Sequence, residues 1–80
     1  MYNLLICDDD RDIRNALKIY LAGEGYKIFA AENGSEALEI VSEDESHLIL
    51  MDIMMPKMDG VSATMKLREN CNAQVIFLTA

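Results

Sequence analysis

Short apolar runs alternate with amphipathic segments along the whole chain, and this alternation limits the fold more than any other feature. The apolar or β-branched runs have the length of strands and cover residues 4–7, 26–31, 48–51 and 75–79. Between the first two runs, Ile13, Leu17 and Tyr20 recur at the spacing of one helix face, and Gly23 and Gly25 end that segment. Each connection is too long for a hairpin, so we expect parallel strands with helices on both faces. The pattern predicts an α/β fold with a three-layer, doubly wound parallel sheet.

Two further helices are indicated by local signals. The stretch from Asn33 to Glu36 is typical of a helix start, and apolar residues at helical spacing follow it. Asp59 and Gly60 are expected to open a short helix over residues 61–68. The run at 48–51 contains no polar residue, which is typical of a strand covered on both faces.

Size and charge exclude several classes of function. The 80 residues leave room for one domain, placed at 1–80, and not for an enzyme with separate cofactor and substrate domains. The 14 acidic and 7 basic residues give a net charge of −7, which repels nucleic acids and anionic lipids, so we expect no direct contact with nucleic acid or membrane. No apolar run approaches the ~20 residues that span a bilayer. Cys7 and Cys71 are expected to be free thiols, as in a cytoplasmic protein.

Acidic residues follow two of the predicted strands. Asp8 and Asp9 end the first run, and Asp52 ends the third. In open parallel sheets, ligands bind outside the carboxyl ends of the strands. With the strand order 2-1-3-4 these two strands are neighbours, and the three carboxylates crowd into one crevice. Such a cluster stays partly protonated or recruits a cation, and an all-oxygen site suits Mg²⁺. The sequence therefore predicts a Mg²⁺ site that also binds phosphoryl groups.

Three motifs carry a resemblance to a known family. LLICDDD, LILMDIMMPKMDG and IFLTA, in this order and spacing, resemble the receiver domain of bacterial two-component response regulators. The resemblance implies a flavodoxin-like fold and makes Asp52 the phosphoacceptor. It implies that Asp8, Asp9, Asp52 and the backbone carbonyl of Met54 hold Mg²⁺, and that Thr79 contacts the phosphoryl group.

The resemblance also implies a function and a partner. A sensor histidine kinase would donate the phosphoryl group to Asp52, and the domain would act as a switch in a phosphorelay and not as an enzyme. The family pattern continues with a helix, a fifth strand ending in a Lys, and a last helix, none of which is among these 80 residues. Residues 13–41 are similar to regulators with a winged-helix output, so we expect a role in transcription regulation through a part absent from this chain.

Two alternatives from other classes stay open. A haloacid-dehalogenase-like phosphatase fragment would use Asp8 as the nucleophile and Asp10 as the second acid, although Asp12 stands where that motif has Thr or Val. A non-phosphorylated module that keeps the receiver fold would bind partners without chemistry. The site of covalent labelling separates the three.

Two further predictions concern the surface. His47 has no metal-ligand partners at suitable spacing and is expected at the surface. The fourth strand becomes an edge in the order 2-1-3-4, although its residues are apolar on both faces. Such an edge predicts self-association of the 80-residue chain.

Overall fold

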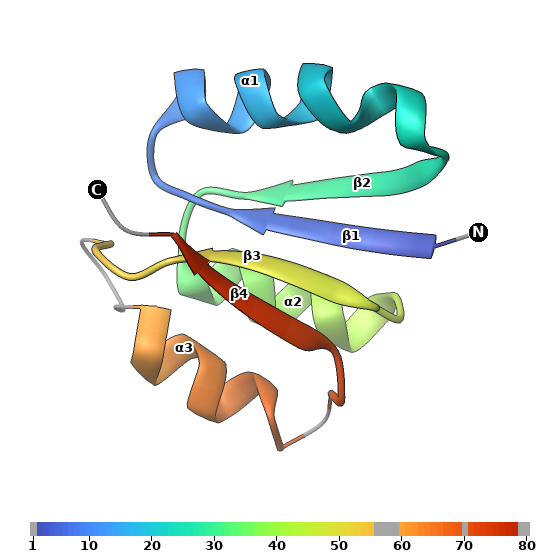
Figure 1. The fold of residues 1–80 in the computed structure, drawn as a ribbon. Coiled ribbons are helices and arrows are strands. Elements are labelled where there is room, and N and C mark those ends of the chain that lie inside the picture. Colours follow the sequence, from blue (N-terminus) through green and yellow to red (C-terminus); the bar gives the residue numbers. More distant parts are fainter. Residues whose placement is uncertain (1, 56–59, 70, 79–80) are drawn as a thin grey trace.

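The computed structural model describes residues 2–55, 60–69 and 71–78. Its four strands form one parallel sheet in the order β2-β1-β3-β4, so all four arrows in Figure 1 point the same way. In chain order the elements are β1 (Tyr2–Cys7), α1 (Arg11–Leu21), the 3-10 turn η1 (Ala22–Glu24), β2 (Tyr26–Ala31), α2 (Gly34–Glu43), β3 (Leu48–Asp52), α3 (Gly60–Leu67) and β4 (Gln74–Leu78). The predicted α/β class, strand order and doubly wound arrangement are confirmed.

Local side-chain chemistry sets where the first two helices begin. The carboxylate of Asp10 accepts hydrogen bonds from the backbone N–H groups of Asp12 and Ile13, which caps α1. Asn33 caps α2 in the same way by accepting from the N–H of Glu36 at 2.9 Å. The turn after η1 uses Gly25 with φ +79°, a left-handed conformation that favours glycine.

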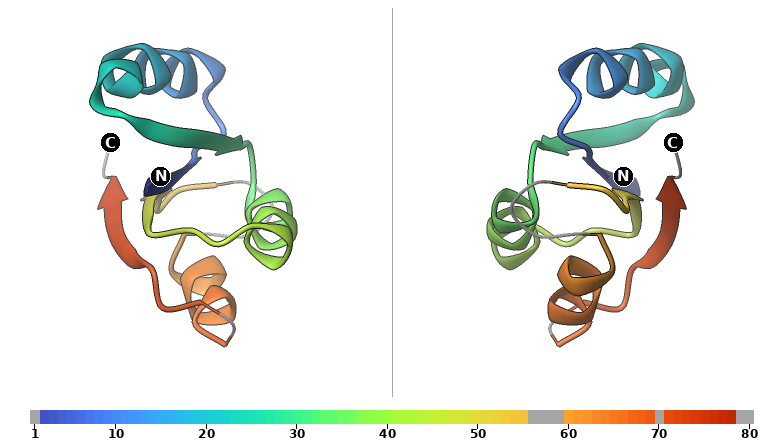
Figure 2. Two further views of the ribbon diagram at one scale, coloured as in Figure 1. Left: turned by 90° about the vertical axis from the view of Figure 1, so that its right-hand side faces the viewer. Right: turned by 90° about the vertical axis from the view of Figure 1, so that its left-hand side faces the viewer.

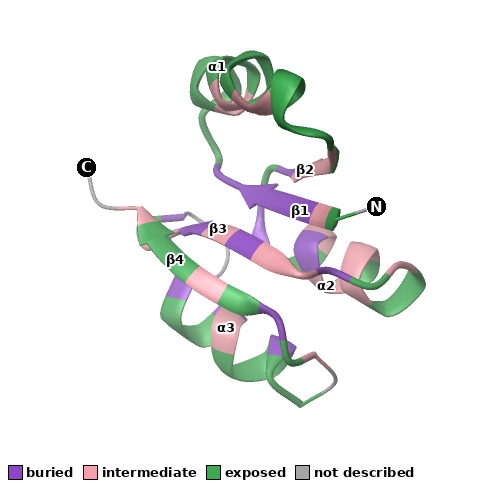
Figure 3. Ribbon diagram, turned by 45° about the vertical axis from the view of Figure 1, so that its right-hand side comes forward, coloured by how far each residue is buried: buried purple, intermediate pink, exposed green. Residues whose placement is uncertain are grey.

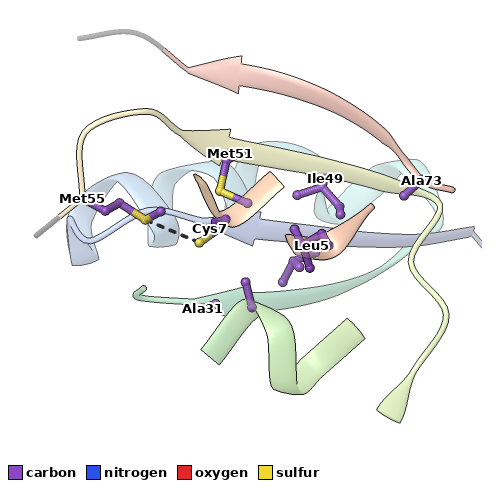
Figure 4. Close-up of a cluster of buried hydrophobic side chains, with 10 residues drawn as sticks. Leu5, Cys7, Ala31, Ile49, Met51, Met55 and Ala73 are labelled. Atoms are coloured by element: carbon purple, nitrogen blue, oxygen red, sulfur yellow. Dashed lines mark hydrogen bonds between the residues drawn. The ribbon is translucent and has the colours of Figure 1, made fainter. Parts of the chain in front are cut away.

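The face of the sheet under α2 and α3 is a closed core. Figures 1 and 2 show these two helices together on one side of the sheet, with α1 on the other. The buried cluster combines strand side chains with small helix residues, which let the helices approach closely. Figure 4 shows part of it; its members are Leu5, Cys7, Ala31, Ala37, Ile49, Met51, Met55, Ala63, Leu67 and Ala73.

The opposite face is covered over only half its width. Leu4 and Ile6 are fully buried beside α1, yet α1 itself contains no buried residue, as the absence of purple on this helix in Figure 3 shows. Tyr20 on this helix is 83% exposed. Leu48 and Leu50 of β3 are only half-buried. The expectation that this strand is covered on both faces is therefore wrong for the α1 side, because α1 packs over β1 and β2 and leaves β3 and β4 open.

The amino end of the sheet is held together by His47. The His47 Nδ1 atom accepts a hydrogen bond from the backbone N–H of Asn3 at 2.9 Å. The backbone N–H of His47 donates to the carbonyl of Asn3, also at 2.9 Å. The imidazole also stacks on the ring of Tyr2, with centroids 4.8 Å apart. His47 is half-buried and structural, so its predicted place at the surface is corrected. The pairing of His47 with Asn3 joins residues 44 positions apart, and no local sequence pattern indicates such a contact.

Among the residues that the structure describes, no helix is long and apolar enough to cross a membrane.

Candidate metal centre

The carboxyl ends of β1 and β3 bring three acidic side chains together. The strands are paired with Cys7 opposite Met51, so Asp8 and Asp52 leave adjacent strands at the same edge. One carboxylate oxygen each from Asp8, Asp9 and Asp52 can be chosen so that all three atoms lie within 4.8 Å of one another. The predicted convergence of these residues is thus present in the structure.

Backbone contacts fix the position of Asp8. Its N–H donates to the carbonyl of Ala31 at 3.1 Å, which ties the start of the loop to β2. Its Oδ1 accepts the N–H of Asp10 at 2.8 Å, and its carbonyl accepts from the Arg14 guanidinium at 2.8 Å. Only 3% of Asp8 is exposed, whereas Asp9 is exposed. Asp8 is therefore held in a fixed position by hydrogen bonds, and Asp9 faces solvent.

The pKa of Asp52 is raised by its position in the cluster. Burial raises the pKa of its carboxyl above the ordinary value of 3.8, and the neighbouring carboxylates of Asp8 and Asp9 raise it further. The N–H of Met54 opposes this shift by donating to Asp52 Oδ1 at 3.1 Å. A divalent cation would reverse the balance, because it favours the ionised form of all three acids.

The same cluster acts on the thiol of Cys7. Burial, followed by the charges of Asp8, Asp52 and Glu36, raises the pKa of Cys7 from 9.0 to about 12. The Sγ atom contacts Met55 Sδ, marked by the dashed line in Figure 4, at a distance of 3.5 Å. It also lies 3.5 Å from the carbonyl oxygen of Asn33. Cys7 is therefore a protonated core residue and is unsuited to bind a cation.

A cavity of about 430 Å³ opens above the carboxylates. One side is acidic and the other is apolar, and the lining residues are Asp8, Asp9, Asp10, Ile13, Leu17, Asp52, Met54 and Leu78. The all-oxygen donor set with access to water fits a hard divalent ion that keeps several water ligands, such as Mg²⁺. The room above it suits a small anionic group bound to that ion.

Some of the predicted site residues cannot be placed in this way. Thr79, the expected phosphoryl contact, and Asp59, the expected helix cap, lie outside the described residues. Met54 lines the cavity, and the residue is 73% exposed.

The contacts that two residues make near the site were not predicted from the sequence. Arg14 holds the carbonyl of Asp8, and Gly60 lies against the backbone of Asp52. The contact of Arg14 could have been predicted, because a basic residue in the first turns of a helix that follows three acids can reach back to them. The contact of Gly60 depends on how closely α3 approaches β3 in space, and no local sequence pattern indicates that approach.

A second cavity, of about 470 Å³, lies at the opposite, amino end of the sheet. It is lined by Tyr2, Val41, Glu45, Ser46, His47, Cys71, Asn72 and Ala73. The His47 imidazole is engaged by Asn3 and Tyr2, and the N–H of Ala73 donates to Cys71 Sγ at 3.4 Å. Within the described part of the chain, the acidic cluster that could hold a metal ion, Asp8, Asp9 and Asp52, lies at the carboxyl end of the sheet and not beside this cavity.

The sequence profile of the response regulator receiver domain matches residues 4–80. The chain belongs to this family. It is a receiver domain of two-component response regulators, and the family match leaves the dehalogenase-like alternative without support.

Relatives and solved structures agree with this assignment. The chain is 46% identical over 77 residues to the transcriptional regulatory protein SrrA of Staphylococcus aureus, covering 96% of this chain and 32% of SrrA. It thus spans about a third of the length of that relative. The response regulator TrrA of Thermotoga maritima, solved in complex with Mg²⁺-BeF, is 40% identical with a TM-score of 0.92, over 100% of this chain and 70% of TrrA. A CheY-like receiver domain protein of Methanospirillum hungatei is 30% identical with a TM-score of 0.94, over 99% of this chain and 64% of that one.

Proposed function

We propose that Asp52 accepts a phosphoryl group from a sensor histidine kinase while Mg²⁺ is held by Asp8, Asp9, Asp52 and the carbonyl of Met54. The observation that carries this proposal is the convergence of three carboxylates within 4.8 Å at the ends of β1 and β3. The resemblance to TrrA, which was solved with Mg²⁺-BeF, supports it.

The chain's own groups suit this reaction. The N–H of Met54 holds Asp52 Oδ1, which fixes the rotation of the carboxylate. A carboxylate oxygen attacks phosphorus, a P–O bond forms, and the P–N bond to the donor histidine breaks, with a proton taken up by the leaving imidazole. When bound, Mg²⁺ would neutralise the charge of the phosphoryl oxygens. The product adds negative charge beside Asp8 and Asp9, and the resulting local rearrangement is the switch.

The rest of the signalling role is proposed by analogy with the relatives. Thr79 would contact the phosphoryl group. SrrA is a transcriptional regulatory protein, so we propose transcription regulation as the output of the parent protein. We propose a cytoplasmic location, which the proposed kinase partner and the free thiols of Cys7 and Cys71 support. In this role the domain is an acceptor and not an enzyme.

A labelling experiment tests the proposal. The wild-type chain, Asp52→Asn and the control Asp12→Asn are incubated with a small-molecule phosphodonor, with and without millimolar Mg²⁺, and the labelled residue is mapped by mass spectrometry. We expect Mg²⁺-dependent label on Asp52 in the wild type and the control and none in Asp52→Asn, because an amide cannot form an acyl phosphate. Label on another residue, or an unlabelled wild type, contradicts the proposal; the latter favours the non-phosphorylated interaction module.

We also propose that the 80-residue chain self-associates through β4. Among the strands of the described residues, β4 pairs with β3 alone. On its two faces Ile76 is 51% exposed and Phe77 is 41% exposed. Unpaired backbone groups flanked by apolar side chains are a template for a second strand. β4 itself is uncharged, while the net charge of −7 opposes association, so added salt should favour the oligomer.

Light scattering over a wide concentration range tests this second proposal. We expect the mass to rise with protein concentration, and Ile76→Lys to lower the association constant by at least about tenfold, since a charge on the edge opposes pairing. A wild-type chain that stays monomeric at the highest concentration overturns it.

A further inference from the structure

Helix α3 begins in direct contact with the end of β3. Gly60, its first residue, is buried, and its N–H donates to the carbonyl of Ile53 at 2.9 Å. Ile53 follows Asp52, so the first turn of α3 lies against the peptide that carries the proposed phosphoacceptor.

The contact leaves no room for a side chain. A Cβ atom on Gly60 would lie 2.2 Å from the carbonyl oxygen of Asp52, and 2.9 Å from both the carbonyl carbon of Asp52 and the Cα of Ile53. Real Cβ atoms essentially never approach other atoms within 3.0 Å. All three atoms belong to the backbone, so no rotamer change can relieve the clash. A methyl group would require a shift of roughly 1 Å at this junction to restore an ordinary contact.

The rest of α3 cannot simply move away from the sheet. Ala63 and Leu67, one and two turns further on, are buried in the core against the strands. The hydroxyl of Thr64 donates to the carbonyl of Gly60 at 2.8 Å, which adds a second bond within the first turn. The displacement therefore falls on the junction between Gly60 and the Asp52–Ile53 peptide.

We propose that Gly60 is a positioning residue for Asp52. Its missing side chain lets α3 close on β3, and this contact keeps the Asp52 carboxylate in reach of Asp8, which is fixed separately by β1 and β2. The role rests on the proposed function for its biological meaning, but the geometry that it predicts is independent of phosphorylation. A misplacement of about 1 Å at a reacting group can cost roughly 100-fold in rate.

The chain offers a matched control for the test. Gly23 has no atom within 4 Å of an added Cβ and no positive φ, so Gly23→Ala introduces the same methyl group into open space. Gly25 is unsuitable as a control because its φ of +79° strains any L side chain.

The experiment compares wild type, Gly60→Ala and Gly23→Ala, after thermal melts have set a temperature at which each is folded. Mg²⁺ affinity is measured by NMR titration, and hydrogen exchange of the Met54 amide reports its bond to Asp52 Oδ1 without any metal. For Gly60→Ala we expect Mg²⁺ affinity to fall at least about tenfold and Met54 exchange to accelerate by a similar factor; Gly23→Ala should stay within about twofold of wild type on both. If the phosphodonor labels the wild type, the rate on Gly60→Ala should fall roughly 100-fold.

Two outcomes overturn the inference. A folded Gly60→Ala chain with wild-type Met54 exchange and wild-type Mg²⁺ affinity overturns it. So does a Gly60→Ala chain that stays unfolded in trimethylamine N-oxide, because Gly60 would then be required for folding and not for positioning. A wild type that takes no label removes the proposed function alone, since Met54 exchange in the two variants still decides the role of Gly60.

Discussion

The two ends of the sheet are built on opposite principles. At the amino end, β1, β3 and β4 are joined by backbone bonds through His47, which contacts Asn3 and accepts the N–H of Gln74 at its carbonyl, at 3.1 Å. At the carboxyl end, one oxygen from each of three like-charged carboxylates lies within 4.8 Å of the others, and the Arg14 guanidinium donates to the backbone carbonyl of Asp8. The amino end stabilises the fold. The carboxyl end is destabilised by repulsion between carboxylates, which a bound cation would neutralise.

The largest predicted difference between the ends is in cysteine reactivity. Cys7 lies at the carboxyl end and Cys71 at the amino end. The rise in the pKa of Cys7 from 9.0 to about 12 lowers its thiolate fraction by about 1000-fold at pH 8, and burial slows attack further. We expect iodoacetamide to modify Cys71 first and to leave Cys7 intact until the chain unfolds. Mass spectrometry with Cys71→Ser as the single-thiol control checks this; rapid alkylation of native Cys7 would contradict it.

The second prediction removes one charge from the carboxyl end. Asp9→Ala should weaken Mg²⁺ binding on the order of 100-fold, or about 2.7 kcal/mol, because a close charge partner of the ion is lost. Asp12→Ala, an acid in the first turn of α1 outside the cluster, should change the affinity by less than about threefold. Titration calorimetry measures both, and unchanged affinity in Asp9→Ala would show that the ion binds elsewhere.

The third prediction breaks the amino end. His47→Ala leaves the N–H of Asn3 without its acceptor and removes the ring that stacks on Tyr2, so we expect the free energy of unfolding to fall by about 1–3 kcal/mol. Glu45 is the matched control, because its exposed carboxylate lies 3.6 Å from His47 Nε2 and Glu45→Ala should cost at most about 0.5 kcal/mol. Urea unfolding measures the two, and equal losses would show that the imidazole has no special role.

The smallest predicted effect relieves the repulsion at the carboxyl end. Because the pKa of Asp52 is raised in the folded chain, that state binds more protons than the unfolded chain above pH 3.8, and stability falls as the pH rises through the raised pKa. Asp52 is partly exposed, so solvent screens the repulsion. Asp52→Asn should therefore stabilise the metal-free chain at pH 7 by at most about 1 kcal/mol, which is a few degrees in Tm. The gain should shrink below pH 3.8, where both states are protonated, and when Mg²⁺ is added. A variant less stable than wild type at pH 7 would refute this account.

The sequence predicted the elements better than the contacts between them. Strand β2 (Tyr26–Ala31) has the predicted bounds, and the helix start at Asn33 was expected, because both depend on residues near one another in the chain. The meeting of Asp8 with Asp52 was also predictable, since strand ends and strand order are enough to place both at one edge. The roles of His47 and Gly60 were not, because each depends on which backbone atoms lie opposite in space.

The place of β1 in the middle of the sheet has a consequence for the order of folding. β1 needs β2 on one side and β3 on the other, and its partners in β3 are separated from it by most of the chain. Contacts of such long sequence separation form late, because the loop that they close must first lose its entropy. We therefore expect the repulsion between Asp8 and Asp52 to arise only when β3 docks on β1, since that pairing brings the two carboxylates together. An ion bound between them should then slow unfolding more than it speeds folding, and stopped-flow kinetics with and without Mg²⁺ measure both rates.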